Sequence, residues 1–226
     1  MRKKRIISFL LTLVMVASLF PTATTYASDL PFAYVTIKDD GVYDETGTKW
    51  DTYEGLTFTP ATASTPATLT MENCSMEQGP YDQAWTAIRS ELTEPLMLLV
   101  KGDNALTIDN TSKDDVLERK ERGIAIEIAG DLEIVFDTDA SLTITGACNG
   151  IVAHGKVTIQ DKANITMNLK GWNSTAIKAN DITITGGNVT AVTKGVDSHD
   201  ILASNSFTVT GGTVTLGNNA SVWNMM

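Results

Sequence analysis

Apolar residues alternate with threonine in six short triplets along the chain, each reading apolar–Thr–apolar. The triplets are Leu69–Met71, Leu106–Ile108, Leu142–Ile144, Ile165–Met167, Val189–Ala191 and Val214–Leu216. The first two steps between triplets are long, and the later three are shorter and almost equal. Alternation with a period of two is typical of a half-buried β-strand, and Val, Ile and Thr favour strands. The pattern predicts one strand per repeat, with apolar residues inside and threonine outside.

Two further series of apolar segments lie between the triplets. One comprises Leu132–Ile134, Val157–Ile159, Ile182–Ile184 and Phe207–Val209, in equal steps along the chain. The looser one comprises Ile88, Ile126–Ile128, Ile151–Ala153, Ile177–Ala179 and Ile201–Ala203. One such unit cannot bury its apolar side, whereas stacked units can, because each strand pairs with its counterpart in the next unit. We expect an all-β fold, a right-handed parallel β-helix (solenoid) of about six three-strand coils. An ordinary β-sandwich is the alternative, but it does not require this three-part pattern in every unit.

The predicted solenoid occupies residues 67–226, and residues 28–66 lack the triplet. We expect residues 28–66 to be an N-terminal β cap over the open edge of the first coil. Residues 72–87 and 109–122 are interpreted as corner insertions, the second with a short helix. After the last triplet, the chain either closes with its own terminal residues, is closed by a partner or another copy, or is truncated.

A leader precedes these segments. Residues 1–27 combine a basic start, an apolar run and small residues before the expected cleavage point, which is typical of a secretory signal peptide. We expect a secreted protein without membrane insertion after cleavage, because no later stretch is apolar enough to span a bilayer. The leader holds four of the 17 basic residues and none of the 27 acidic ones, so the mature chain has a net charge near −14. Such a charge repels nucleic acid, which is not expected as a partner.

The chain has two cysteines, Cys74 and Cys148. In the repeat they hold similar corner positions two coils apart, which corresponds to about 10 Å. Bridged Cα atoms lie within roughly 7 Å of each other. The spacing therefore predicts free thiols, although the chain is expected to be exported.

Two acidic clusters are candidate metal ligands. Asp137 and Asp139 are two residues apart in a predicted turn, and Asp197 and Asp200 flank His199. Carboxylate oxygens suit Ca²⁺, but Asp also populates turns for backbone reasons. No basic residue stands in a frame that marks a catalytic base, and His154 is interpreted as a corner residue. The sequence therefore names no reaction.

Aromatic residues in the corners are candidates for carbohydrate binding. Trp172 lies in the turn "KGWNS", and Tyr81 and Trp85 lie in the first insertion. An exposed indole offers a flat platform for a sugar ring, whereas a buried Trp85 would only hold the insertion in place. The outward threonines stabilise neighbouring strands, and a flat hydroxyl face could also dock a crystalline surface.

The arrangement "EPLMLLVKGDNALTI…GIAIEIAGDLEI…ASLTITGACNGIVAHGKVTI…AIKANDITITGGNVTAV" resembles a family of secreted bacterial carbohydrate-binding-domain proteins. The resemblance covers about residues 68–216. It depends on Gly102–Asn104, the Gly-Ile starts at Gly123 and Gly150, and the Gly-Gly corners. The family resembles pectate lyases in fold and is generally not lytic. The resemblance implies polysaccharide binding, with Ca²⁺ as a candidate cofactor.

Three functions remain open at this point. The first is an exported, non-catalytic protein that binds a plant or bacterial cell-wall polysaccharide, with or without Ca²⁺. The second is a Ca²⁺-dependent polysaccharide lyase, and the third is a structural adhesin or stalk at the cell surface. Fold alone cannot separate them.

Overall fold

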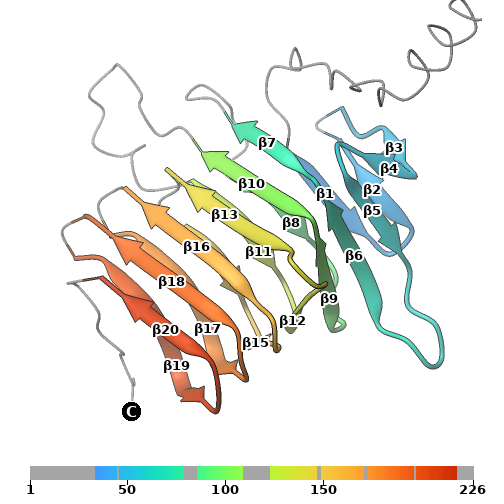
Figure 1. Cartoon of the computed structure of the whole chain (residues 1–226). Helices are drawn as coiled ribbons and strands as arrows, with labels where there is room; N and C mark the ends of the chain where they lie inside the picture. Colours follow the sequence, from blue (N-terminus) through green and yellow to red (C-terminus); the bar gives the residue numbers. More distant parts are fainter. Residues whose placement is uncertain are drawn as a thin grey trace, which may run out of the picture. The chain divides into compact units, whose positions relative to one another are not determined.

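The computed structural model describes residues 34–217, with gaps at 45, 79–85, 109–122, 147–148, 171–172 and 196. The described residues form twenty β-strands and no helix (Figure 1). The chain from residue 31 onward is one compact unit, and the predicted leader lies outside the described residues. Nothing in the described part of the chain qualifies as a membrane-spanning helix. The helix predicted within 109–122 also lies outside the described residues.

Strands from β6 onward form three parallel ladders, which the chain visits in a fixed order. The β13 ladder contains β7 (Ser75–Gln78), β10 (Asp103–Ile108), β13 (Ser141–Thr145), β16 (Asn164–Leu169), β18 (Asn188–Thr193) and β20 (Thr213–Leu216). These six strands form one sheet in this order and pair in parallel. In Figure 1 they lie side by side across the front of the molecule.

The other two ladders share a second sheet. The β11 ladder contains β8 (Thr86–Ser90), β11 (Ile124–Ile128), β14 (Asn149–Ala153) and the first halves of β17 (Thr175–Ile184) and β19 (His199–Val209). The β12 ladder contains β6 (Ala67–Glu72), β9 (Leu96–Lys101), β12 (Leu132–Phe136), β15 (Lys156–Ile159) and the second halves of β17 and β19. The long strands β17 and β19 turn the corner and so join the two ladders.

Most of the predicted stacking is confirmed. Thr143 pairs with Thr166, which pairs with Thr190, all between parallel strands. The equally spaced series is confirmed by the pairs Leu132–Val157, Val157–Ile182 and Ile182–Phe207. The third series is confirmed by the pairs Ile88–Ile126, Ile126–Ile151, Ile151–Ile177 and Ile177–Ile201.

Two predicted alignments at the start of the repeat are wrong. Thr70 pairs with Leu99 in the β12 ladder, so its triplet does not belong to the β13 ladder. Leu106 pairs with Ile144 and not with Leu142. Four residues, 137–140, join the last β12 residue paired with β9 to the first β13 residue paired with β10. On the preceding strands only two residues, 101–102, lie between the corresponding positions. This difference in corner length shifts the triplet by two positions. Residues 72–87 are also more than an insertion, because they contain β7.

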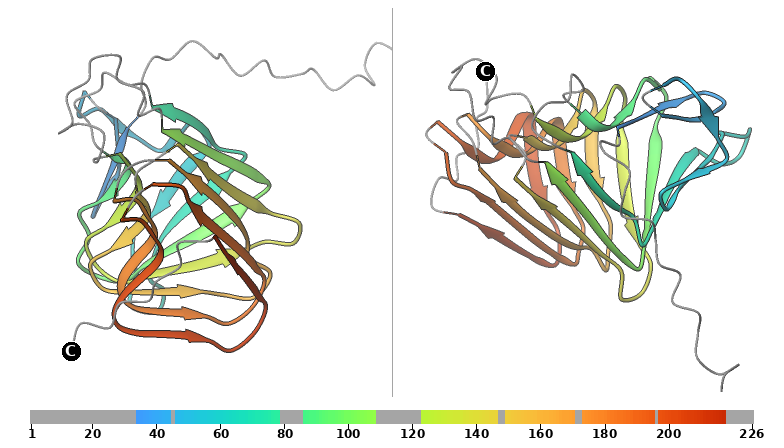
Figure 2. Two further views of the ribbon diagram at one scale, coloured as in Figure 1. Left: turned by 90° about the vertical axis from the view of Figure 1, so that its left-hand side faces the viewer. Right: turned by 90° about the horizontal axis from the view of Figure 1, so that it is seen from above.

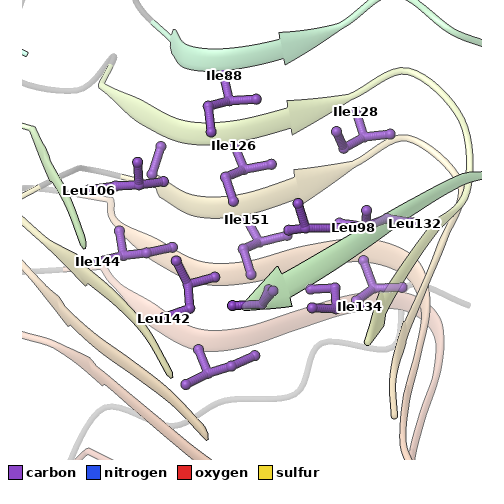
Figure 3. Close-up of a cluster of buried hydrophobic side chains, with 14 of the residues drawn as sticks. Ile88, Leu98, Leu106, Ile126, Ile128, Leu132, Ile134, Leu142, Ile144 and Ile151 are labelled. Atoms are coloured by element: carbon purple, nitrogen blue, oxygen red, sulfur yellow. The ribbon is translucent and has the colours of Figure 1, made fainter. Parts of the chain in front are cut away.

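Side chains from all three ladders point into one interior. Ile126, Leu132 and Ile144, one from each ladder, are at most 1% exposed, and they belong to a single apolar cluster (Figure 3). Figure 2 shows the strands of the ladders on different sides of this interior. Burying a side chain of this size stabilises the fold by about 1.5–3 kcal/mol, so the stacked apolar columns supply the main driving force for folding.

The corner between the β12 and β13 ladders uses left-handed backbone in every turn. Its residues with positive φ are Asn73, Gly102, Asp139, Lys162, Gly187 and Gly212. A Cβ on Gly187 would collide with the backbone of Ala163 in the turn below. Successive turns therefore approach so closely that glycine is needed there, which explains the repeated Gly-Gly of the sequence.

The described N-terminal strands lie along the edges of two ladders. They are β1 (Val35–Lys38), β2 (Gly41–Tyr43), β3 (Lys49–Trp50), β4 (Thr52–Tyr53) and β5 (Leu56–Thr59). β1 pairs with β8 in parallel, and β5 pairs with β6 in antiparallel fashion. These strands therefore cover the first edges of the β11 and β12 ladders, whereas the boundary at residue 66 stays a prediction.

Candidate functional site

The outer side of the β13 ladder carries an ordered array of polar side chains. Thr143, Thr166, Thr190 and Thr215 form a column in which each threonine is paired in register with the next. The neighbours of the first three threonines, such as Leu142 and Ile144, are buried, and those of Thr215 are partly buried. Strand alternation therefore directs the threonines outward and keeps their backbone rigid.

Uncharged residues flank this column on both sides. We call the outward positions of β13, β16, β18 and β20 the Thr face, which comprises Ser141, Thr143, Thr145, Asn164, Thr166, Asn168, Asn188, Thr190, Val192, Thr213 and Thr215. All are exposed or half-buried, and none is ionisable. Apart from Val192, the Thr face therefore presents hydroxyl and amide groups without charge, although the chain carries a net charge of −10.

Charged residues border the Thr face: Lys170 and Lys194 are exposed directly after β16 and β18, and acidic residues lie beyond its start. Asp103 on β10 accepts a hydrogen bond from Ser141 Oγ at 2.7 Å, and Glu77 on β7 is exposed. Thr107 and Thr145 are hydrogen-bonded across β10 and β13, with 3.3 Å between their hydroxyl oxygens. The Thr face thus has an acidic border on the side of β7 and β10.

The predicted metal pair Asp137 and Asp139 forms part of a tight turn. Both residues are exposed, Asp139 has φ of 62°, and the Asp137 carboxylate accepts a hydrogen bond from the Thr138 backbone N–H at 2.8 Å. The backbone N–H of Ala140 also donates to the Asp137 carbonyl at 3.3 Å. Asp137 therefore already has a local structural role, which turn chemistry explains.

The two carboxylates of the second predicted metal pair, Asp197 and Asp200, differ in exposure to solvent. Asp197 is exposed with φ of 56°, whereas Asp200 is fully buried. Asp200 Oδ1 accepts hydrogen bonds from the backbone N–H and the hydroxyl of Thr193 at 2.8 and 2.9 Å. Its Oδ2 has no hydrogen-bond partner among the described residues. No group of three or more His, Cys, Asp or Glu suited to a metal occurs in the described ranges.

Asp200 occupies a column of small residues. The register of the β11 ladder places Ala87, Ala125, Gly150, Ala176 and Asp200 in the same stacked position. The first four fill little space, and Ala176 is fully buried. The sequence did not predict that the Asp200 carboxylate is buried. Asp200 and Ile201 are consecutive and both buried, so inward and outward side chains do not alternate at this point of β19.

A charged cluster on the β11 ladder was missed by sequence reasoning. Glu127 accepts a hydrogen bond from the Thr86 hydroxyl at 3.1 Å, and its carboxylate lies 3.9 Å from Arg89 Nε and 3.6 Å from His154 Nε2. Arg89 and Glu127 are paired in register. Each directly follows an isoleucine of the third series, Ile88 and Ile126, and this shared offset could have identified the pair.

The predicted sugar platforms lie outside the described residues. Tyr81 and Trp85 fall within 79–85, and Trp172 falls within 171–172. A different aromatic, Trp50 of β3, is 42% exposed, and its indole N–H donates to Asp44 Oδ2 at 2.8 Å. Its ring centroid lies 5.6 Å from that of Tyr53.

Cys74 is a free and buried thiol, as predicted. Burial raises the pKa of this thiol to about 12. Cys74 lies between β6 and β7, whereas Cys148 lies in the connection from β13 to β14, so the predicted similarity of their corners is wrong. Cys148 itself lies outside the described residues.

No protein-family model matches this chain, and the comparisons found neither a similar curated protein nor a similar solved structure. The candidate sites are therefore judged on their own geometry and chemistry.

Proposed function

We propose that the chain is a secreted, non-catalytic polysaccharide-binding protein, and that the Thr face is its binding surface. The observation that carries this proposal is the column Thr143–Thr166–Thr190–Thr215, which is held in register on four consecutive strands. Polysaccharides present repeating hydroxyl groups that donate and accept hydrogen bonds. A rigid array of hydroxyl and amide side chains matches this chemistry and loses little conformational entropy on binding.

The architecture that supports this surface is, in our proposal, a right-handed parallel β-helix with residues 28–66 as its cap. The support is the order of the strands, because the chain passes through the β12, β13 and β11 ladders in turn. Parallel crossover connections are right-handed in about 98% of cases. In such a fold, every added coil lengthens the Thr face by one strand.

The aromatic residues predicted to bind sugar lie in two connections along the chain. Residues 79–85 connect β7 to β8, and residues 171–172 lie between β16 and β17. Both connections leave the β13 ladder and enter the β11 ladder. We propose that Tyr81, Trp85 and Trp172 add stacking contacts to a glycan chain that lies along the Thr face.

Calcium assistance is a separate part of the proposal. Asp137, Asp139, Asp197 and Asp200 are the candidate ligands, and Ca²⁺ prefers such oxygens. Among them, the buried Asp200 Oδ2 has no hydrogen-bond partner among the described residues. Glycan binding with and without EDTA tests this part alone.

A lyase is the second candidate function, and the Glu127 cluster is the observation that favours it. Arg89, Glu127 and His154 combine a carboxylate, a fixed positive charge and an imidazole within 4 Å of the carboxylate. Proton abstraction needs a base of this kind together with charge stabilisation. An adhesin or stalk, the third candidate, would bind no glycan and release no product.

A pair of matched variants tests the Thr face. Thr166→Arg places a long charged side chain in the middle of the Thr column, and we expect retention on insoluble cellulose or pectin to fall at least tenfold, roughly 1.4 kcal/mol. Thr183→Arg is the control, because Thr183 is equally half-buried but lies outward on the β12 ladder. The control should bind like the unaltered protein.

Four outcomes of this experiment contradict the proposal. Equal loss in both variants would indicate a general folding or charge effect, and no loss in Thr166→Arg would exclude the Thr face. Unsaturated products that absorb in the ultraviolet would identify a lyase, and their loss in Glu127→Gln would assign the Glu127 cluster. Absence of retention on every glycan would leave the adhesin.

A further inference from the structure

The hairpin of β2 and β3 carries an exposed aromatic side chain. Trp50 is 42% exposed, and within the described ranges Val209 is the one other large apolar residue that is similarly exposed. Single exposed apolar residues are common on protein surfaces, so the exposure alone identifies no site. Trp50 is distinguished by the contacts that hold its ring in place.

Two contacts fix the orientation of the Trp50 indole. Its N–H donates to Asp44 Oδ2 at 2.8 Å, and its ring centroid lies 5.6 Å from that of Tyr53, with 59° between the two ring planes. Across the hairpin, Trp50 is paired with the fully buried Val42. Because the indole is already ordered, a ligand that stacks on it causes little further loss of conformational entropy.

A polar network continues from the N–H edge of the indole. Asp44 Oδ1 accepts hydrogen bonds from the backbone N–H and the hydroxyl of Thr46 and from the backbone N–H of Thr48, at 2.7–2.9 Å. The hydroxyl oxygens of Thr46 and Thr48 lie 2.8 Å apart, and both threonines are exposed. The ring is therefore bordered by a carboxylate and hydroxyl groups, which can bond to the hydroxyl groups of a sugar.

The surroundings of Trp50 are acidic. Residues 39–54 contain six acidic residues and one lysine, Lys49. Lys49 is already paired with Asp40, with 3.0 Å between Nζ and Oδ2. Asp51, which follows Trp50, is exposed. These carboxylates repel a sugar that carries a negative charge, so the charge of the hairpin favours neutral glycans over acidic ones.

We propose that Trp50 is a subsite for one pyranose ring of a neutral polysaccharide. This inference rests on the proposed polysaccharide-binding function and narrows its ligand to uncharged glycans. The C–H groups on one face of the sugar stack on the indole, and the sugar hydroxyls bond to the Asp44 network. Aromatic side chains with a few placed polar groups are typical of small-ligand sites.

The proposed subsite is separate from the Thr face. β3 ends the path of the larger sheet, whereas the Thr face belongs to the smaller sheet. A cation is the other ligand that could contact an indole beside a carboxylate. Aromatic cages for cations use several ring faces, whereas Tyr53, the ring in contact with Trp50, is only 9% exposed. The geometry therefore favours a sugar.

An NMR titration tests the subsite on the unaltered chain without its predicted leader. The neutral probes are cellohexaose, xylohexaose and mannohexaose, and the charged probes are hexagalacturonate and tetramethylammonium. We expect at least one neutral hexasaccharide to shift the indole N–H signal of Trp50 in a saturable way. Neither charged probe should do so. The signal is assigned by its absence from the spectrum of Trp50→Phe.

Calorimetry in a Thr166→Arg background, in which the Thr face is blocked, isolates the contribution of the subsite. We expect the dissociation constant of the bound hexasaccharide to rise roughly tenfold or more in Trp50→Ala, which removes the stacking surface. Trp50→Phe retains a smaller ring and should raise it less. The control Tyr43→Phe removes a hydroxyl that donates to Asp40 in the same hairpin, and should leave the dissociation constant unchanged.

The outcomes separate this inference from the proposal for the Thr face. No shift of the Trp50 signal with any neutral hexasaccharide would overturn the subsite, even if retention on insoluble glycan depends on Thr166. A shift with tetramethylammonium or hexagalacturonate alone would also overturn it and indicate a cation or an acidic glycan. A saturable shift with a neutral probe, together with unchanged retention of Thr166→Arg, would support the subsite and contradict the Thr face.

Discussion

A buried amide joins three turns of the chain. Asn104 is 2% exposed, and its side-chain N–H groups donate to the carbonyls of Lys101, Gly102 and Ser141 at 3.0–3.2 Å. Its Oδ1 accepts a hydrogen bond from the Cys74 backbone N–H at 2.9 Å. Asn104 therefore links backbone groups of the corner before β7, of its own corner and of β13.

Replacement of Asn104 should destabilise the fold strongly. Asn104→Leu matches the size of its register partner Leu142 but takes the acceptor away from the Cys74 backbone N–H and removes one hydrogen bond from each of the carbonyls. A buried group left unpaired costs about 1–3 kcal/mol. We expect the free energy of unfolding in urea to fall by at least about 2 kcal/mol. The exposed Asn164→Leu is the control, with a change within about 0.5 kcal/mol. Equal stability of both variants would show that Asn104 is dispensable.

The Cys74 thiol should be unreactive in the folded protein. Its pKa of about 12 exceeds the ordinary 9.0 because burial disfavours the thiolate, and the Glu54 carboxylate adds to this effect. At pH 8 the thiolate is therefore roughly a thousandfold rarer than in the unfolded chain. In a Cys148→Ser background, we expect slow alkylation in buffer and rapid alkylation in urea. Rapid reaction in buffer would contradict the buried position.

At the scale of elements, the hairpin of β2 and β3 is held by one carboxylate. Asp44 Oδ1 accepts hydrogen bonds from the backbone N–H groups of Thr46 and Thr48, each at 2.9 Å. Its Oδ2 accepts the Trp50 indole N–H at 2.8 Å. Desolvation raises the pKa of Asp44, but these bonds and one from the Thr46 hydroxyl outweigh it and lower the pKa to about 2.

This hairpin should loosen only in strong acid. Because the pKa of Asp44 is lower in the folded chain than its ordinary value of 3.8, the carboxylate stabilises the folded form above about pH 4. That contribution disappears as the pH falls toward 2. We expect the NMR signal of the Trp50 indole N–H to titrate near pH 2 and to show no such step in Asp44→Asn. A midpoint near pH 4 would mean that these hydrogen bonds are weak in solution.

The register between repeats could be predicted from the sequence where the connections between strands have the same length in each repeat. Val157, Ile182 and Phe207 stack as expected, because the steps between them are equal. Leu69 was assigned to the wrong ladder, since apolar–Thr–apolar describes any strand with an outward threonine, and both ladders contain such strands. β7, "SMEQ", lacks the triplet altogether, so only its pairing with β10 identifies it.

The candidate site was less predictable than the fold. The Thr face follows from strand alternation, because Thr166 and Thr190 had to point away from a buried core. The burial of Asp200 does not follow from its own residue type; only its alignment with the small residues that precede each isoleucine of the third series, such as Ala176, indicates it. Contacts such as Glu127 with His154 join residues on successive turns and require the true register.

Over the whole molecule, charge is distributed unevenly. The Thr face and residues 201–217 lack ionisable side chains, whereas the net charge of the chain is −10. The remaining surface keeps copies apart in solution. The uncharged Thr face therefore lets another molecule approach without the repulsion that the rest of the surface would cause.

The constant offset between paired strands has an evolutionary consequence. Val157, Ile182 and Phe207 are separated by equal lengths of chain, so a duplicated stretch of that length would meet the same neighbours above and below as its original. Tandem duplication or loss of such a stretch within the gene can thus change the number of stacked turns by whole units, while the contacts between the remaining turns stay the same.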